Sequence, residues 1–238
     1  MSQLIRHMVW STAVVMIVSG CGTPAHYEIV LAGGTVIDGT GAPARVADVA
    51  ITDGRITAIE PNILPDQADR WIDVSGRVVS PGFWDNHAHL VTLQMWPDAE
   101  NFVRQGITTI LAPLHSQDQP FPLDEYRENA EIGPNVGLFA GHTWIRKRVM
   151  GLENRAPTPE ELSWMVALVD SSMQQGALGF STGLEYVPAI FADTDEIVAL
   201  AEIAADYGGI YVTHMRDEGV RVLESIAETL EVGRRASI

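Results

Sequence analysis

Histidine is the residue type that could do chemistry in this chain, because five of its seven histidines follow apolar, strand-like segments. The five are His87, His89, His115, His142 and His214, and they follow four different segments. The carboxyl ends of parallel strands share one edge of a sheet, where active sites form. A lone histidine at such an edge is more often a hydrogen-bonded structural residue than a metal ligand. Five histidines at one edge are not explained by packing, however, because the cores of parallel sheets favour Val, Ile and Leu. Imidazole binds zinc and similar ions, which activate water, so we expect a metal centre.

The sequence His87-Ala88-His89 is the most specific part of this histidine pattern. Residues i and i+2 of a strand face the same side, so both imidazoles can point at one ion. The same pair on a surface strand would be two solvated histidines. The apolar flanking sequence and the preceding Pro-Gly turn favour burial instead. Asp85, two residues earlier, could orient a ligand by hydrogen bonding.

Strand-like and helical segments alternate after Pro81-Gly82. We expect strands over 78–89, 108–115, 136–142, 177–182 and 210–215, and helices over 98–105, 124–130, 158–175, 194–207 and 219–235. This alternation predicts a parallel sheet with helices outside, of the α/β class. Periodicity alone does not choose between an open doubly wound sheet and a closed (β/α)₈ barrel.

Two further segments precede this region. Residues 27–80 alternate β-branched runs with Gly-containing turns, which predicts a small β-sandwich or meander. Residues 1–21 combine Arg6, an apolar run and Val18-Ser19-Gly20-Cys21, which resembles a bacterial lipoprotein signal ending in the lipidated cysteine. The alternative is an ordinary signal peptide with an incidental cysteine. We therefore expect domains at 1–21, 27–80 and 81–238.

Composition restricts the partners of the chain. Its hydrophobic fraction of 46% is that of a globular protein, and its formal net charge of −16 disfavours nucleic acid as a partner. Membrane contact is expected only through a lipid anchor on Cys21. That anchor would place the protein on the periplasmic side of a bacterial cell envelope, and Gly22 after the cysteine favours the outer membrane.

Four stretches resemble a known family. PGFWDNHAHL is similar to the end of the first barrel strand in the amidohydrolase superfamily, and QGITTI, GALGFSTGLEYVP and YGGIYVTHMRDEG resemble its N-acyl-D-amino-acid deacylase (D-aminoacylase) branch. The resemblance implies an incomplete TIM-like (β/α) barrel of about five of eight βα units, preceded by a small β-sandwich domain. It also implies a zinc site holding one or two divalent ions.

The matching motifs assign roles to individual residues. The resemblance implies that His87, His89 and His214 are metal ligands and that Tyr186 lies near the acyl-amino-acid pocket. Arg216 or Tyr186 could hold a substrate carboxylate, although Arg216 could equally pair with Asp217 or Glu218. His142 matches a Gly-His that lines the site, with a structural role equally open.

The chain departs from the family pattern at two points. His115 stands where the family has a metal-binding cysteine, and a neutral imidazole there would change the affinity and charge of the centre. The family's next histidine ligand and its catalytic aspartate fall beyond Ile238. Residues 21–238 alone are therefore expected to be inactive, because five strands do not close an eight-stranded barrel.

The expected function is metal-dependent hydrolysis of the amide bond in N-acyl-D-amino acids, small-molecule substrates. One alternative is a cyclic-amide hydrolase or dipeptidase on the same fold. The cyclic-amide enzymes use a carboxylated lysine of the barrel, whereas the only lysine here, Lys147, lies in a charged Arg-Lys-Arg segment. The other alternative is a non-catalytic lipoprotein fragment.

Cys21 provides the first prediction. Mass spectrometry of membrane-extracted protein should find a diacylglyceryl group on an N-terminal peptide that begins at Cys21, because the apolar run places this cysteine at a lipoprotein cleavage site. A Cys21→Ala variant serves as the control and should leave the membrane fraction. A mature protein that begins at another residue would contradict the assignment.

Overall fold

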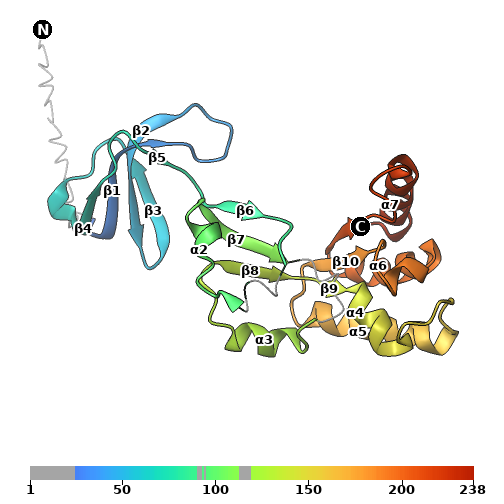
Figure 1. The fold of residues 1–238 in the computed structure, drawn as a ribbon. Helices are drawn as coiled ribbons and strands as arrows, with labels where there is room; N and C mark the ends of the chain where they lie inside the picture. The colour runs from blue at the N-terminus through green and yellow to red at the C-terminus, as the bar shows by residue number, and fades with distance from the viewer. Residues whose placement is uncertain (1–24, 90–92, 94, 113–118) are drawn as a thin grey trace, which may run out of the picture. The chain divides into compact units, whose positions relative to one another are not determined.

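The computed structural model describes residues 25–89, 93, 95–112 and 119–238. They fall into two compact units that divide the sequence between Pro81 and Gly82 (Figure 1). Cys21 and His115 lie outside the described residues, so their predicted roles stay predictions. Among the described helices, none is long and apolar enough to cross a membrane.

The first unit is built on a five-stranded sheet. Its strands are β1 (Tyr27–Val36), β2 (Arg45–Thr52), β3 (Arg55–Glu60), β4 (Ala68–Asp73) and β5 (Val78–Val79), with a 3-10 turn, η1 (Pro65–Gln67), before β4. The order is β3-β2-β1-β4, with β5 also on β1. Buried Asp48 accepts the backbone N–H groups of Gly33 at 2.7 Å and Ile63 at 2.8 Å, which ties β2 to the bulge in β1 and to the loop after β3.

The described part of the second unit forms six parallel strands in two short sheets. They are β6 (Phe83–Asp85), β7 (Ile107–Ala112), β8 (Asn135–Leu138), β9 (Ala140–Gly141), β10 (Gly179–Gly183) and β11 (Ile210–His214). The sheet orders are β6-β7-β8 and β9-β10-β11 (Figure 1). Only Phe139 separates β8 from β9, so one stretch of chain pairs first with β7 and then with β10. The strands therefore follow one another in sequence order, as the βα alternation predicts.

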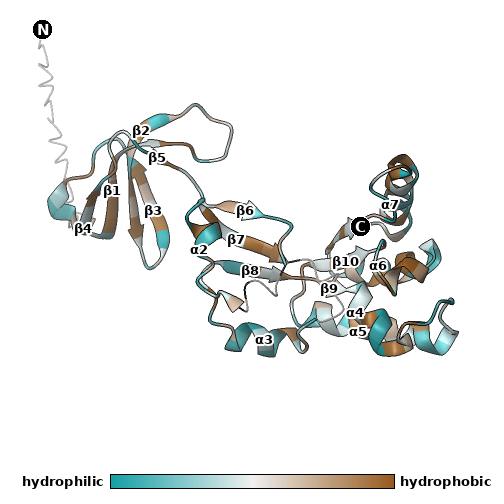
Figure 2. Ribbon diagram, in the orientation of Figure 1, coloured by the Kyte–Doolittle hydropathy of each residue, from teal (hydrophilic) through white to brown (hydrophobic). Residues whose placement is uncertain are grey.

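Among the described residues, the helices confirm five expected segments and include one that was not expected. They are α2 (Glu100–Val103), α3 (Leu123–Asn129), α4 (His142–Met150), α5 (Pro159–Gln174), α6 (Thr194–Asp206) and α7 (Val222–Ala236), with a 3-10 turn, η2 (Ala189–Phe191). Figure 2 colours β7 largely hydrophobic, whereas α3 is mostly hydrophilic. Helix α4 was not expected, because its Arg-Lys-Arg sequence reads as a loop and its N-cap, Gly141, has no capping side chain. Lys147 therefore lies on an exposed helical face.

A buried ionic network joins α4 to α6. The carboxylate of Glu196 accepts a hydrogen bond from Arg146 and lies 2.8 Å from Nε2 of His142, and these two side chains are 0% exposed. Arg146 also donates to the carbonyl oxygen of Arg155 at 2.6 Å. Burial alone would raise the pKa of Glu196, but the hydrogen bonds from His142 and Arg146 hold it below its ordinary value. The carboxylate is therefore ionised and binds the two helices together.

Removal of Glu196 should destabilise this unit strongly. Glu196→Ala would leave the buried Arg146 guanidinium uncompensated, which costs about 3–5 kcal/mol of unfolding free energy. Urea denaturation of the full-length protein measures this as a lower midpoint. The matched control is Glu202→Ala on the exposed face of α6, with an expected change within about 0.5 kcal/mol. Equal midpoints for the two variants would contradict the role of the network.

Candidate metal centre

Two segments far apart in the sequence supply the histidines of the site. His214 is the last residue of β11, while His87 and His89 lie in the loop after β6. The prediction of a strand through His89 is wrong, because β6 ends at Asp85, whose carboxylate accepts the backbone N–H of His87 at 3.0 Å. The loop nevertheless continues alongside β7, since Ala88 N–H donates to the carbonyl oxygen of Leu111 at 3.2 Å.

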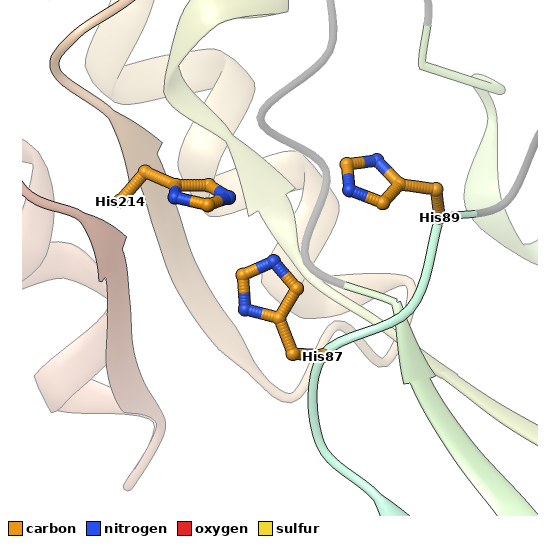
Figure 3. A group of neighbouring side chains, drawn as sticks. All are labelled: His87, His89 and His214. Carbon is orange, nitrogen blue, oxygen red and sulfur yellow. The ribbon is translucent and has the colours of Figure 1, made fainter.

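The three imidazoles converge. One nitrogen from each of His87, His89 and His214 lies within 4.8 Å of the others (Figure 3). The ring of His87 is centred 4.6 Å from that of His214, nearly perpendicular to it, and 5.9 Å from that of His89. Three nitrogen donors gathered in this way are a candidate set of ligands for a single divalent ion. The structure thus brings together three of the four predicted ligands.

The environment of His87 favours the form that binds metal. Desolvation, followed by the charges of His214 and His89, lowers the pKa of His87. His87 is therefore neutral at physiological pH, with a lone pair available for a cation. The burial expected for His87 and His89 is not found: both are exposed, and the flanking Phe83 and Trp84 are 60% and 68% exposed. His214 is half-buried.

Glu218 is the residue of the site that the sequence did not single out. Its Oε1 lies 3.0 Å from Nδ1 of His214 and accepts the backbone N–H of Met215 at 3.1 Å. The hydrogen bond from His214 lowers the pKa of Glu218, which is therefore ionised. The sequence signal that could have indicated this contact is the four-residue spacing between His214, at the end of a strand, and Glu218.

Tyr186 lies beside the centre. It follows β10, and its ring is centred 5.6 Å from that of His214 in an edge-on arrangement. Partial burial, together with the negative charges of Glu185 and Glu218, raises the pKa of Tyr186. The phenol consequently stays protonated at physiological pH and can donate a hydrogen bond.

Arg216 is engaged elsewhere. Its Nε and Nη2 donate to the carboxylate of Glu228 at 2.9 and 2.8 Å, and its guanidinium also donates to the carbonyl oxygens of Ile190 and Ala192 at 2.9 Å each. Its ionic partner is thus on α7, not Asp217 or Glu218 within its own loop. A role in holding a substrate carboxylate, which stays a prediction, would require Arg216 to exchange some of these contacts.

His142 lies within the buried network with Glu196, at 0% exposure, and packs against Phe180 with ring centres 6.0 Å apart. The predicted contact with substrate is not tested by this arrangement and stays a prediction.

The donor set fits a borderline divalent ion. Imidazole nitrogens are ligands of zinc and similar metals, and a site with three protein ligands leaves a position for water or substrate. The exposure of two of the rings leaves the site accessible from solvent.

Comparison with curated proteins finds D-amino-acid deacylases among the relatives of this chain. The chain is 36% identical to a D-aminoacylase and 36% identical to an N-acyl-D-aspartate deacylase, both from Alcaligenes xylosoxydans xylosoxydans. Each match covers 89% of this chain and 49% or 48% of the relative, so the chain spans about half their length. No family model matches.

Solved structures agree with these relatives. A D-aminoacylase described as defining a novel subset of amidohydrolases has a TM-score of 0.77 at 36% identity, over 89% of this chain and 50% of that one. The N-acyl-D-glutamate deacylase of Bordetella bronchiseptica, in complex with zinc and a phosphonate inhibitor, has a TM-score of 0.81 at 30% identity with the same coverage. The chain is therefore related, over about half of their length, to amidohydrolases of the N-acyl-D-amino-acid deacylase branch.

Proposed function

We propose that the protein containing this chain is a zinc-dependent hydrolase that cleaves the amide bond of N-acyl-D-amino acids. The convergence of His87, His89 and His214 within 4.8 Å carries this proposal. The relatives add the substrate class, since two of them are named for D-amino-acid deacylation. Because the chain spans about half of those relatives, the proposed activity is that of the whole protein.

The chain's own residues would bind and orient the reacting groups. His87, His89 and His214 would hold one zinc ion, which in such sites polarises a carbonyl group and activates water. Glu218 holds the His214 ring in place through Nδ1. Tyr186, protonated and next to His214, is placed to donate a hydrogen bond to a substrate oxygen. Tyr186 and Arg216 are the two groups considered for the substrate carboxylate, and Arg216 would have to exchange contacts to bind it, because its Nε and Nη2 already donate to Glu228 and Ala192.

The finer architecture and location form part of this proposal. The sequential pairing of β6 through β11, with β8 and β9 counted as two parts of one strand, supports their being the first five strands of a (β/α)₈ barrel. The five-stranded sheet would be its preceding β-sandwich domain. A lipid anchor on Cys21 would hold the protein on the periplasmic side of the cell envelope.

Loss of two ligands should remove the metal. The double variant His87→Ala/His89→Ala, in the full-length protein, should lower zinc affinity by more than about 100-fold, which exceeds the effect of losing one outer hydrogen-bond partner. Metal analysis after dialysis against a weak chelator measures the loss, and circular dichroism checks the fold. His26→Ala, which removes an exposed histidine of the first unit, is the matched control and should retain zinc. Wild-type zinc content in the double variant would refute the centre.

A substrate panel should separate the proposed activity from ring opening. The full-length protein with zinc should hydrolyse N-acetyl-D-amino acids at least about 100-fold faster in kcat/KM than their L enantiomers, equivalent to about 2.7 kcal/mol. Hydantoins and dipeptides should be poor substrates. Opening of a hydantoin without acyl release would instead support a cyclic-amide hydrolase.

A further inference from the structure

We propose that Arg216 is a positioning residue that holds Tyr186 beside His214. It does so by anchoring the segment between β10 and α6, the Tyr186 loop (residues 184–193). The inference rests on the proposed function, because there Tyr186 donates a hydrogen bond to the substrate.

The Tyr186 loop is attached at both of its ends to the end of β11 and the residues that follow it. At the start of the loop, Leu184 N–H donates to the carbonyl oxygen of His214 at 2.9 Å. Near its end, the carbonyl oxygens of Ile190 and Ala192 accept hydrogen bonds from the Arg216 guanidinium at 2.9 Å each. The first attachment joins two backbone groups and needs no particular side chain, whereas the second depends on the side chain of Arg216.

The second attachment reaches Tyr186 through a single residue. Ile190 N–H donates to the carbonyl oxygen of Tyr186 at 2.8 Å, and the carbonyl oxygen of Ile190 accepts Nη1 of Arg216. Ala189, between them, is 0% exposed, so this turn is packed against the core. A displacement of Ile190 would therefore move Tyr186, whose ring is centred 5.6 Å from that of His214.

Arg216 is itself held firmly enough to act as an anchor. Its Nε and Nη2 donate to the carboxylate of Glu228 at 2.9 and 2.8 Å, and such a two-point contact fixes the plane of the guanidinium. Glu228 also accepts the hydroxyl of Thr194, the first residue of α6, at 3.0 Å. The side chains of Arg216 and Glu228 are only 24% and 17% exposed, so solvent screens their attraction weakly. Arginine stays protonated in proteins, so this anchor depends neither on pH near neutrality nor on a bound ion.

The contacts of Arg216 require the shape of arginine as well as its charge. Its donors diverge in one plane, which lets them reach one carboxylate and two carbonyl oxygens together. The lysine ammonium is a compact charge on a flexible chain and lacks this geometry. Arg216→Lys should therefore keep an ion pair with Glu228 but lose the anchors on Ile190 and Ala192.

The first test measures the Tyr186 loop directly. In the full-length protein, Arg216→Lys should speed hydrogen exchange of the Ile190 and Ala192 amides, which donate within the loop, by at least about 10-fold. Mass spectrometry of a peptide covering residues 184–193 measures this exchange without substrate. The matched control is Arg221→Lys, since Arg221 is 61% exposed and pairs with Asp217 in the segment before α7. It should leave exchange in the Tyr186 loop unchanged.

The second test asks whether Arg216 acts through Tyr186. The probe is the N-acetyl-D-amino acid that the full-length protein hydrolyses fastest in the substrate panel. Arg216→Lys and Tyr186→Phe should each lower kcat/KM by about 10- to 100-fold, mainly through a higher KM, because each removes or misplaces one hydrogen bond to the substrate. Adding Arg216→Lys to Tyr186→Phe should cost less than about a further 3-fold, since the group that Arg216 positions is already gone. A direct contact between Arg216 and the substrate carboxylate would instead make the two losses multiply.

The outcomes separate this inference from the proposed function. Unchanged hydrogen exchange in Arg216→Lys would overturn the anchor, and losses that multiply would overturn the positioning role. If the wild type hydrolyses no N-acetyl-D-amino acid, the proposed function fails, and the exchange experiment still decides whether Arg216 holds the loop. If Arg216→Lys does not fold, Glu228→Gln keeps the shape of the carboxylate, weakens its hold on the guanidinium and should show the same faster exchange.

Discussion

The metal centre depends on the parallel register between β10 and β11. The two strands pair from Gly179 with Ile210 to Gly183 with His214, so the last pair of the ladder places an imidazole at the carboxyl edge of the sheet. Side chains alternate between the two faces of a strand, and a slip of one residue would turn His214 to the opposite face. Thr182 reinforces this register, because its hydroxyl lies 2.6 Å from that of Thr213 and 2.9 Å from that of Tyr211.

The helix-facing side of the same sheet has an unusual core for a parallel fold. Phe180 is fully buried there, but it packs against His142, which lies 2.8 Å from Glu196. A buried ion pair is a weak source of net stability, since desolvation opposes the attraction between the charges. It is demanding in geometry, however, because the carboxylate has to meet both His142 and Arg146. The network thus restricts how α4 and α6 can pack, and the position of β10 with them.

Much of this arrangement could be predicted from local sequence. Helix α5 is an example, since Thr158 and Glu161 form the capping box expected where Thr-Pro-Glu-Glu precedes an apolar periodicity. His214 was also predictable, because a histidine after a β-branched run falls at a strand end. The features that could not be predicted depend on tertiary contacts. The β6 strand ends at Asp85 because the aspartate side chain takes the N–H of His87, and α4 forms although its own sequence reads as a charged loop. Neither Glu196 nor Glu228 could be assigned in advance, because each finds its arginine on another element.

The acidic residues around the site have consequences for an anionic substrate. An N-acyl amino acid carries a carboxylate, and Glu185 and Glu218 both act on the neighbouring Tyr186 through their negative charges. Arg216 is the cation that the sequence suggests for binding this carboxylate. Glu228, however, balances the charge of Arg216 and raises its pKa. Two acidic groups beside a compensated arginine make the described part of the site electrostatically unfavourable to an anion. A divalent cation on His87, His89 and His214 would reverse that local charge, because a bound ion is the largest charge in such a site. Neutral histidine ligands suit this task, since they leave the full charge of the ion uncompensated.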